Sequence, residues 1–389
     1  MIMNKVMYSQ LFVCLFGVLL FSCCNNPTED TSKKRNILFY IGGDSDVSGD
    51  ALAKINRMRY GWQPGFGEML IYIDRMGDGA YLLRINETKD AGGYYGLDTI
   101  RYYGEENSAD YRVLERVIND VVVNYSADSY GMVFFSHASG WLPEGTLNRP
   151  RSLVIDNDNG GGNSEMEYYD FAAAIPDKQF DFIIFEACLM ADVMTMYELR
   201  NKTEYVLASA AEIVVPGFRD IYAGNVMNLF NTKSSVKNIL TGFGQDFYEI
   251  RGSVYNSITL SLLNMNEMEN LASVTKSVLK GKNIDHTNLT VDSIQIFDRP
   301  RFLSGRPYSR YFDFAQTMEN LVSDSDYKVF DEQLQKTVVW KISTDKFLPN
   351  HYGFDVKYHS GLTTYISQGV YEELIDPAFK NSSWYKAIY

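Results

Sequence analysis

The sequence has no excess of positive charge and few cysteines and histidines. Its 389 residues include 36 Lys and Arg against 49 Asp and Glu, which gives a formal net charge of −13. A chain without a basic excess cannot neutralise many phosphates, so the composition argues against nucleic-acid binding. The sequence also lacks zinc, phosphate-loop and dinucleotide signatures. Hydrophobic residues make up 46% of the chain, enough to build one large α/β domain or two medium ones.

The N-terminal apolar run is too short for an ordinary membrane-spanning helix. Leu11 to Phe21 is eleven residues long and follows Lys5, as in a signal peptide. It ends in Leu20-Phe21-Ser22-Cys23, which resembles a lipobox. We therefore expect residues 1–22 to be a lipoprotein signal peptide, and residues 23–35 to be a lipid anchor on Cys23 and a polar tether. This predicts export to a bacterial membrane, at the outer membrane or cell surface. A plain signal peptide cut nearby is the alternative.

Cysteine is scarce in the part of the chain that would fold. Three of the four cysteines, Cys14, Cys23 and Cys24, lie in the signal and anchor segments. The mature domain would hold Cys188 alone, so no disulfide can form within it. A single thiol in an exported protein is exposed to oxidation. Cys188 is therefore either buried and inert or retained for chemistry.

Short apolar runs alternate with helical patterns in the first half of the chain. The turn Gly77-Asp78-Gly79 indicates a hairpin between two of the runs. This alternation predicts an α/β fold with a parallel-dominated sheet and helices on both faces. The expected strands are 36–41, 68–74, 80–86, 130–136, 180–185 and 205–209, and the expected helices are 51–60, 108–125, 166–175 and 189–199.

Beyond about residue 220 the pattern becomes mainly helical. No strong linker divides the chain, so residues 36–389 are expected to form one unit. The expected helices are 225–230, 235–250, 265–280, 311–322 and 326–343, and the expected strands are 257–263 and 362–367.

His137 and Cys188 each follow a predicted buried strand. Ligands of open α/β sheets bind at the carboxyl edge of the strands, where two such loops can meet. A helix beginning at Leu189 would lower the pKa of the thiol, and His137 could take its proton. The backbone N–H groups of Cys188 and Ala138 could then bind an oxyanion. Taken singly, Cys188 could be a small buried apolar residue and His137 a core or loop histidine.

Two segments resemble the clostripain family of cysteine peptidases, which has a caspase-like fold. They are Ser136-His137-Ala138-Ser139-Gly140-Trp141, and FDFIIFEACLMADVMTMYELRNKTEYVLAS over residues 180–209. The family pattern is a strand ending in His-Gly-x-Gly-Trp and a later strand ending in Asp-Ala-Cys. The resemblance covers roughly residues 36–220 and extends weakly to 359–367. It implies that His137 and Cys188 are catalytic.

The sequence departs from this pattern at two positions. Ala138 stands where the family has Gly, and Ala fits there only if φ is negative or the loop relaxes. Glu186 stands where the family has an Asp that binds a basic P1 side chain, the residue before the cleaved bond. Because Glu186 precedes Cys188 by two residues, strand alternation is expected to place its side chain on the same face as the thiol. The resemblance also implies that Ser209 helps to bind substrate. The alternative is that Glu186 caps the helix that follows it.

The loop between the two motifs carries two further features. The resemblance implies that cleavage at a basic residue here, Arg149 or Arg151, could activate the enzyme; solvated loop charges are the alternative. Asp156 to Gly161, with Glu167, is loosely similar to a calcium loop, but Gly160 stands where an acid is needed. We expect no required cofactor, and a flexible acidic loop is preferred over a calcium site.

The sequence thus predicts a monomeric cysteine endopeptidase that cleaves proteins or peptides after Arg or Lys. A catalytically inactive surface-binding lipoprotein on the same fold is the first alternative, favoured by Ala138. An active enzyme with another P1 preference is the second, and Glu186 leaves it open.

Overall fold

The computed structural model describes residues 33–43, 48–146, 153–156, 164–299, 301–303, 306–369 and 374–389. Residues 33–389 belong to one compact unit. Cys23, Arg149 and Arg151 lie outside the described residues, so the predictions that concern them are not placed in the structure. None of the helices in the described ranges is long and apolar enough to cross a membrane.

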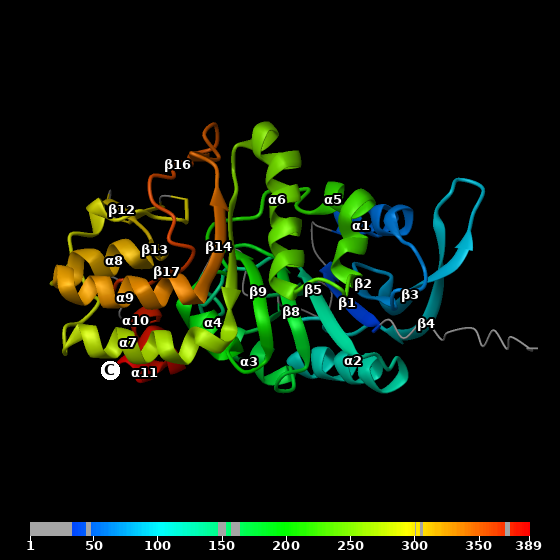
Figure 1. The fold of residues 1–389 in the computed structure, drawn as a ribbon, viewed down its shortest axis with the longest axis horizontal. Coiled ribbons are helices and arrows are strands. Elements are labelled where there is room, and N and C mark those ends of the chain that lie inside the picture. Colours follow the sequence, from blue (N-terminus) through cyan, green and yellow to red (C-terminus); the bar gives the residue numbers. More distant parts are fainter. Residues whose placement is uncertain are drawn as a thin grey trace, which may run out of the picture. The chain divides into compact units, whose positions relative to one another are not determined.

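A nine-stranded sheet runs through the unit (Figure 1). Its strands follow the order β14-β10-β9-β8-β5-β1-β2-β3-β4. Their bounds are β1 (Arg35–Gly43), β2 (Met69–Arg75), β3 (Gly79–Lys89), β4 (Tyr95–Gly104), β5 (Ser129–Phe135), β8 (Phe180–Glu186), β9 (Thr203–Ser209), β10 (Thr259–Asn264) and β14 (Val338–Ser343).

The centre of the sheet is parallel and its two flanks are antiparallel. The pairs β9-β8, β8-β5, β5-β1 and β1-β2 are parallel. The pairs β2-β3, β3-β4, β10-β9 and β10-β14 are antiparallel. The central strands are nearly continuous apolar runs because helices cover both of their faces. The α/β fold predicted from the sequence is confirmed, including the hairpin at Gly77-Asp78-Gly79.

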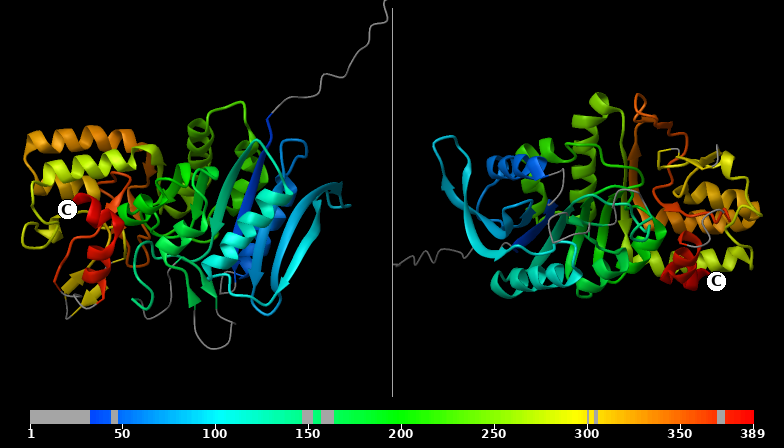
Figure 2. Two further views of the ribbon diagram at one scale, coloured as in Figure 1. Left: turned by 90° about the horizontal axis from the view of Figure 1, so that it is seen from below. Right: turned by 180° about the vertical axis from the view of Figure 1, so that it is seen from behind.

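Helices cover both faces of this sheet (Figures 1 and 2). Their bounds are α1 (Ser48–Gly61), α2 (Tyr111–Asn124), α3 (Tyr168–Ala174), α4 (Val193–Leu199), α5 (Arg219–Asn225), α6 (Val236–Tyr255), α7 (Met268–Leu279), α8 (Phe314–Leu321), α9 (Asp324–Thr337), α10 (Ile375–Asn381) and α11 (Ser383–Ile388). Short 3-10 turns occupy Val226–Phe230, Met265–Glu267 and Val291–Ser293. Two-residue and three-residue strands form small separate sheets: β6 (Ile155–Asp156), β7 (Ser164–Glu165), β11 (Arg301–Leu303), β12 (Arg306–Tyr308), β13 (Phe312–Asp313), β15 (Lys346–Phe347), β16 (Phe354–Asp355) and β17 (Thr363–Thr364).

Two hydrophobic layers lie on opposite sides of the sheet. Along β8, Phe182 and Ile184 belong to the layer that contains α1, α5 and α6, which we call the α6 face. Ile183 and Phe185 belong to the layer that contains α2, α3, α4 and the C-terminal helices, which we call the α4 face. This alternation is the two-residue period of a strand buried on both sides.

Several expectations from the sequence were wrong, and three of them concern the main sheet or the segment that follows Cys188. No strand was expected at β4, which lies at one edge of the sheet. The helix expected over residues 326–343 ends at Thr337, and the chain continues directly into β14. The helix expected from Leu189 begins only at Val193, because Leu189 has a φ of 62°, which a right-handed helix excludes.

Candidate active site

His137 and Cys188 leave the sheet side by side. Phe135 on β5 and Glu186 on β8 are register partners in the parallel ladder. His137 follows Phe135 by two residues and Cys188 follows Glu186 by two residues, so both lie at the same edge of the sheet. Neighbouring strands are about 4.8 Å apart. The fold therefore brings together the two loops that the sequence singled out, from positions 51 residues apart.

The loop that carries His137 is fixed at both ends. Ser136 donates a hydrogen bond from its Oγ to the carbonyl of Gly42 on the neighbouring strand β1, at 2.8 Å. Tyr311 donates from its hydroxyl to the carbonyl of Ser139. Trp141 is almost fully buried and packs against Tyr365, with the ring centroids 5.0 Å apart. These contacts hold the histidine loop against both β1 and the C-terminal part of the chain.

The loop that carries Cys188 is a turn held by backbone hydrogen bonds. The N–H of Leu189 donates to Ala211 at 2.9 Å, and the N–H of Ala191 donates to Ser209 at 3.0 Å. Thr363 donates its N–H to the carbonyl of Ala191, also at 2.9 Å. Cys188 itself is half-buried and packs against the α4 face. The nucleophile candidate is therefore on a rigid turn with part of its surface accessible.

The expected effect of a helix N-terminus on Cys188 is not supported. Helix α4 begins at Val193, and its N-cap is Asp192, whose Oδ1 accepts from the N–H of Thr195 at 2.9 Å. Cys188 lies four residues before this cap, and the field of a helix dipole falls off within one turn. Asp192 instead caps this helix N-terminus. Burial raises the pKa of the Asp192 carboxyl to about 7.

Gly140 brings the two loops into contact. Its φ is +57°, a conformation that L side chains rarely adopt. A Cβ at this position would lie 2.5 Å from the carbonyl oxygen of Leu189 and 2.9 Å from Oδ2 of Asp192. Gly140 corresponds to the second glycine of the family pattern His-Gly-x-Gly-Trp. The close approach of the Cys188 loop requires a glycine at this position.

Ala138 occupies its position without a left-handed backbone. It is buried, and it is not among the residues of positive φ. An Ala in place of the family's Gly was expected to fit only with a negative φ or a relaxed loop, and this backbone meets that condition. The carbon added by Ala138 packs into the α4 face.

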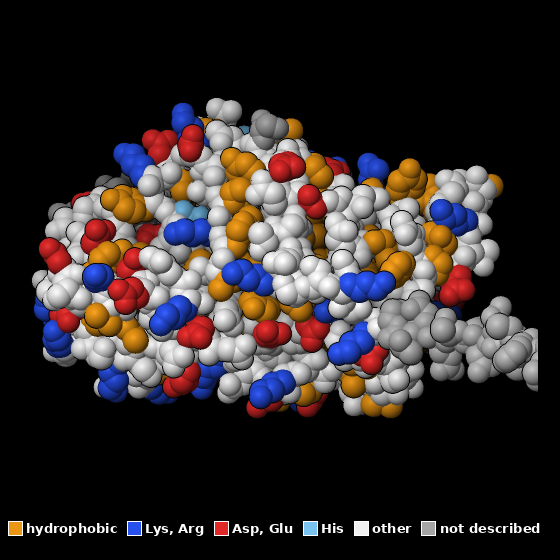
Figure 3. Space-filling model, in the orientation of Figure 1, with side chains coloured by type: hydrophobic (Ala, Val, Ile, Leu, Met, Phe, Trp, Pro, Cys, Tyr) orange, Lys and Arg blue, Asp and Glu red, His pale blue; other side chains and the backbone are white. Residues whose placement is uncertain are grey.

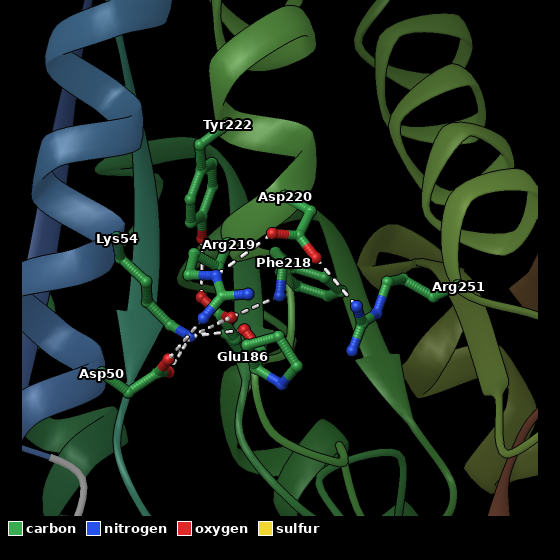
Figure 4. Close-up of polar contacts among 9 residues, drawn as sticks. Asp50, Lys54, Glu186, Phe218, Arg219, Asp220, Tyr222 and Arg251 are labelled. Carbon is green, nitrogen blue, oxygen red and sulfur yellow. Dashed lines mark hydrogen bonds and ion pairs between the residues drawn. The ribbon is translucent and has the colours of Figure 1, made fainter. Parts of the chain in front are cut away.

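Glu186 is enclosed in the protein interior on the α6 face (Figure 4). Its Oε1 lies 3.0 Å from Nζ of Lys54, and the hydroxyl of Tyr222 donates to Oε2 at 2.6 Å. The backbone N–H of Phe218 also donates to Oε1. Burial raises the pKa of this carboxyl above its ordinary value, and Lys54 and the two donors act in the opposite direction.

Two expectations about Glu186 differ from its position. Strand alternation was expected to place its side chain beside the thiol of Cys188, but β8 ends at Glu186 and the chain turns, so the alternation stops there. Cys188 packs against the α4 face, whereas Tyr222 belongs to the α6 face. Glu186 also does not cap α4, since Asp192 does.

Ser209 lies beside Glu186 on the neighbouring strand. Ile184 and Leu207 are register partners, and Glu186 and Ser209 each follow by two residues. The hydroxyl of Ser209 is buried and lies 3.0 Å from Oγ1 of Thr259. Its role in substrate binding stays a prediction.

The acidic loop that resembles a calcium site is described only at its ends. Asp156 is buried and accepts from the N–H of Ser108 at 2.8 Å. Glu167 accepts from the N–H of Glu144 at 2.8 Å, and burial raises its pKa to about 7. Residues 157–163 lie outside the described residues. Within the ranges that are described, no three His, Cys, Asp or Glu side chains are grouped as metal ligands.

Sequence reasoning missed Lys54, Tyr311 and Thr363. Lys54 carried a signal, because it follows Asp50 by four residues and lies between Ala51 and Ile55 on the buried stripe of α1. Tyr311 and Thr363 hold the two loops from a region where the sequence indicated only helices and a strand. Their contacts depend on tertiary packing, and nothing in their local pattern indicates it.

A cysteine and a histidine on adjacent loops at the carboxyl edge of a parallel sheet form an arrangement typical of cysteine peptidases of caspase-like fold. The clostripain family model matches residues 39–377. The chain belongs to the clostripain family.

Known proteins are similar to this chain in sequence and in structure. Clostripain of Hathewaya histolytica is 24% identical over 223 residues, which are 50% of this chain and 42% of that protein's own length. Among solved structures, an inactive zymogen C11 protease from Parabacteroides distasonis is 27% identical with a TM-score of 0.77. A secreted C11 cysteine protease from Bacteroides thetaiotaomicron, in complex with an irreversible peptide inhibitor, is 28% identical with a TM-score of 0.76. Both alignments cover 92% of this chain and 99% of the other.

Proposed function

We propose that this protein is a cysteine endopeptidase in which Cys188 is the nucleophile and His137 its general base. The observation that carries the proposal is the matched placement of the two residues, each two positions beyond the register pair Phe135 and Glu186. The Cys188 turn and the histidine loop are held rigidly by separate hydrogen bonds. A rigid pair keeps the reacting groups aligned, which lowers the entropic barrier to attack.

In this mechanism His137 removes the proton from the thiol, and the sulfur attacks the carbonyl carbon of the substrate. The N–H groups of Cys188 and Ala138 donate to the oxyanion that forms. The C–N bond then breaks as the protonated His137 gives its proton to the leaving amine. Water, activated by the same histidine, hydrolyses the thioester and restores the enzyme.

Replacing the nucleophile tests this proposal. Cys188→Ala should lower turnover of a peptide mixture by roughly 10⁴-fold or more, as loss of other catalytic nucleophiles does. The melting temperature should change little, since Cys188 is half-buried and Ala keeps its Cβ. The same variant should no longer react with a thiol-directed peptide probe. Unchanged turnover in Cys188→Ala would contradict the proposal.

The alternative function is an inactive binding protein on the same fold, and it predicts a different result in these experiments. It predicts a folded wild-type chain that neither cleaves peptides nor reacts with the probe. Ala138 was the feature that favoured it, and the backbone of Ala138 fits its loop without positive φ. That fit supports the enzyme.

Cleavage after Arg or Lys is the finer prediction from the resemblance. It needs a carboxylate that can receive a cation from the substrate. Glu186, the residue implied for this role, is already in contact with Lys54. We therefore propose the peptidase activity itself, and cleavage after Arg or Lys stays a prediction from the resemblance.

We also propose that Cys23 anchors the protein to a bacterial membrane. The support is the Leu20-Phe21-Ser22-Cys23 run after an apolar segment of eleven residues. The chain from Lys33 onward then forms the exported peptidase.

A further inference from the structure

The histidine loop and the Cys188 turn are both held by a small separate sheet in the C-terminal part of the chain. Tyr311, the residue before β13, donates from its hydroxyl to the carbonyl of Ser139 in the histidine loop. On β17, Thr363 donates its N–H to the carbonyl of Ala191 in the Cys188 turn, at 2.9 Å. Strands β13 and β17 pair with each other beside α8 (Figure 1). The alignment of the two catalytic loops therefore depends on how firmly these two short strands are joined.

The carboxylate of Asp313 joins the two strands. Asp313 is 1% exposed and is the register partner of Thr363. Its Oδ2 accepts from the N–H of Ser360 at 2.7 Å, in the segment that leads to β17. Its Oδ1 accepts from the N–H of Gln316 at 3.0 Å in the first turn of α8. One side chain thus fixes the segment before Thr363 to the strand that follows Tyr311.

The paired strands are too short to hold this position alone. Their ladder consists of the pairs Phe312 with Thr364 and Asp313 with Thr363. An isolated two-stranded ladder is marginally stable in water even when it is longer. Burial raises the pKa of the Asp313 carboxyl, and the two N–H donors act in the opposite direction. Both of its oxygens accept from an N–H, which a carboxylate can do and an amide cannot.

Helix capping accounts for only one of these two hydrogen bonds. Ser323, the N-cap of the next helix α9, uses a single side-chain oxygen, which accepts from the N–H of Asp326 at 3.3 Å. At Asp313 the bond to Gln316 has the same function. The bond to Ser360 reaches 47 residues along the chain and contributes nothing to the cap. The second oxygen therefore serves the connection between β13 and β17.

We propose that Asp313 is a positioning residue that keeps His137 and Cys188 aligned, acting through Tyr311 and Thr363. Without the bond to Ser360, β17 and the Cys188 turn would be free to shift relative to the histidine loop. A misplacement of about 1 Å can cost on the order of 100-fold in rate, even when the change is remote from the reacting atoms. This inference rests on the proposed peptidase activity and adds a residue to its machinery.

The test compares Asp313→Asn with Ser323→Ala. Asn can still cap α8, but its amide nitrogen cannot accept the second N–H. Asp313→Asn should lower kcat on a peptide substrate by about tenfold or more and change KM by less than about threefold, because alignment is lost and the substrate-binding surface is not. Ser323→Ala removes the cap of α9 and should lower the melting temperature by about 1–3 °C without changing kcat.

A double-mutant cycle with Tyr311→Phe tests the route of the effect. This substitution removes only the hydroxyl that holds Ser139, and it should also lower kcat by about tenfold. Once the histidine loop is released from β13, fixing β13 to β17 no longer aligns the two loops. The double variant Asp313→Asn, Tyr311→Phe should therefore lose much less activity than the product of the two single losses.

Two results would overturn the inference and leave the peptidase intact. They are a kcat of Asp313→Asn equal to that of Ser323→Ala, and losses that multiply in the double variant. Should Asp313→Asn not fold, Tyr311→Phe decides: a tenfold loss of kcat supports the inference, and an unchanged kcat contradicts it. If the folded wild type neither cleaves peptides nor reacts at Cys188 with a thiol-directed probe, the proposed function fails and the role of Asp313 fails with it.

Discussion

Gly140 is a residue that no side chain could replace without moving the turn that carries Cys188. Its positive φ and the 2.5 Å distance from a built Cβ to the carbonyl of Leu189 are separate constraints. The first concerns the backbone of Gly140 alone, and the second concerns the alignment of two loops. A substitution here should therefore affect activity as well as stability.

A pair of glycine variants separates these two constraints. Gly145→Ala adds a Cβ at a φ of +74° where nothing lies within 4 Å, so it should cost only backbone strain, about 1 kcal/mol. Gly140→Ala should destabilise by roughly 1–3 kcal/mol more, because the loop must shift, and should lower turnover at least tenfold. Urea unfolding and peptide turnover measure both. Equal effects in the two variants would show that Gly140 does not align the loops.

At this scale the sequence predicted that His137 and Cys188 lie on neighbouring loops, but it did not predict all of their surroundings. Two-residue alternation suggested that Glu186 lies beside the thiol. That argument holds only within a strand, and β8 ends at Glu186. The positive φ of Leu189 then changes the direction of the chain. Because this residue is not a glycine, the sequence gives no signal of the turn.

At the scale of helices and strands, a glycine on α6 lets this helix lie close to β14. A Cβ on Gly244 would lie 2.6 Å from the indole ring of Trp340. Trp340 lies on β14, which pairs with β10 and ends the sheet on that side. The missing side chain lets helix α6 lie close to this antiparallel flank.

This contact predicts opposite effects for two glycines of one helix. Gly244→Ala should destabilise the domain by about 1–3 kcal/mol, the usual cost of overpacking. Gly242→Ala, with nothing within 4 Å, should stabilise it by about 0.5–1 kcal/mol through helix propensity. Urea unfolding of the chain from Lys33 measures both. A stabilising Gly244→Ala would mean that Trp340 moves freely and that the close approach is not required.

Strands β4 and β14 were missed because each lacks a local signal in the sequence. The edge strand β4 has no buried residue and alternates between intermediate and exposed positions, so it offers no apolar run. Helix α9 passes into β14 without a Gly or Pro, and its helical pattern therefore seemed to continue. The buried parallel strands were predicted within one or two residues because their apolar runs are distinct from their flanks.

For the whole molecule, the C-terminal part does more than extend the sheet. Tyr311 and Thr363 contact the histidine and cysteine loops, and the helices from α7 onward contribute to the α4 face. The family match over residues 39–377 includes this part. The surface in Figure 3 has acidic and basic side chains interspersed over the face shown.

The predicted anchor is a property of the full chain. Cys23→Ser should move the protein from the membrane fraction to the soluble fraction of the producing cells. Each buried methylene of a lipid contributes about 0.8 kcal/mol, so acyl chains hold firmly and their loss releases the protein. Cys24→Ser is the matched control and should stay with the membrane. Equal membrane retention of both variants would contradict lipidation of Cys23.

The position of β1 gives such an anchor a mechanical consequence. The strand begins at Arg35, where the predicted tether ends, and it is hydrogen-bonded to β5 on one side and β2 on the other. A pull on the tether therefore acts along the strand and loads both ladders in shear. An edge strand under the same force would be peeled away one bond at a time. A tether joined to β1 therefore loads an interior strand that is hydrogen-bonded on both sides, and not an edge strand of the sheet.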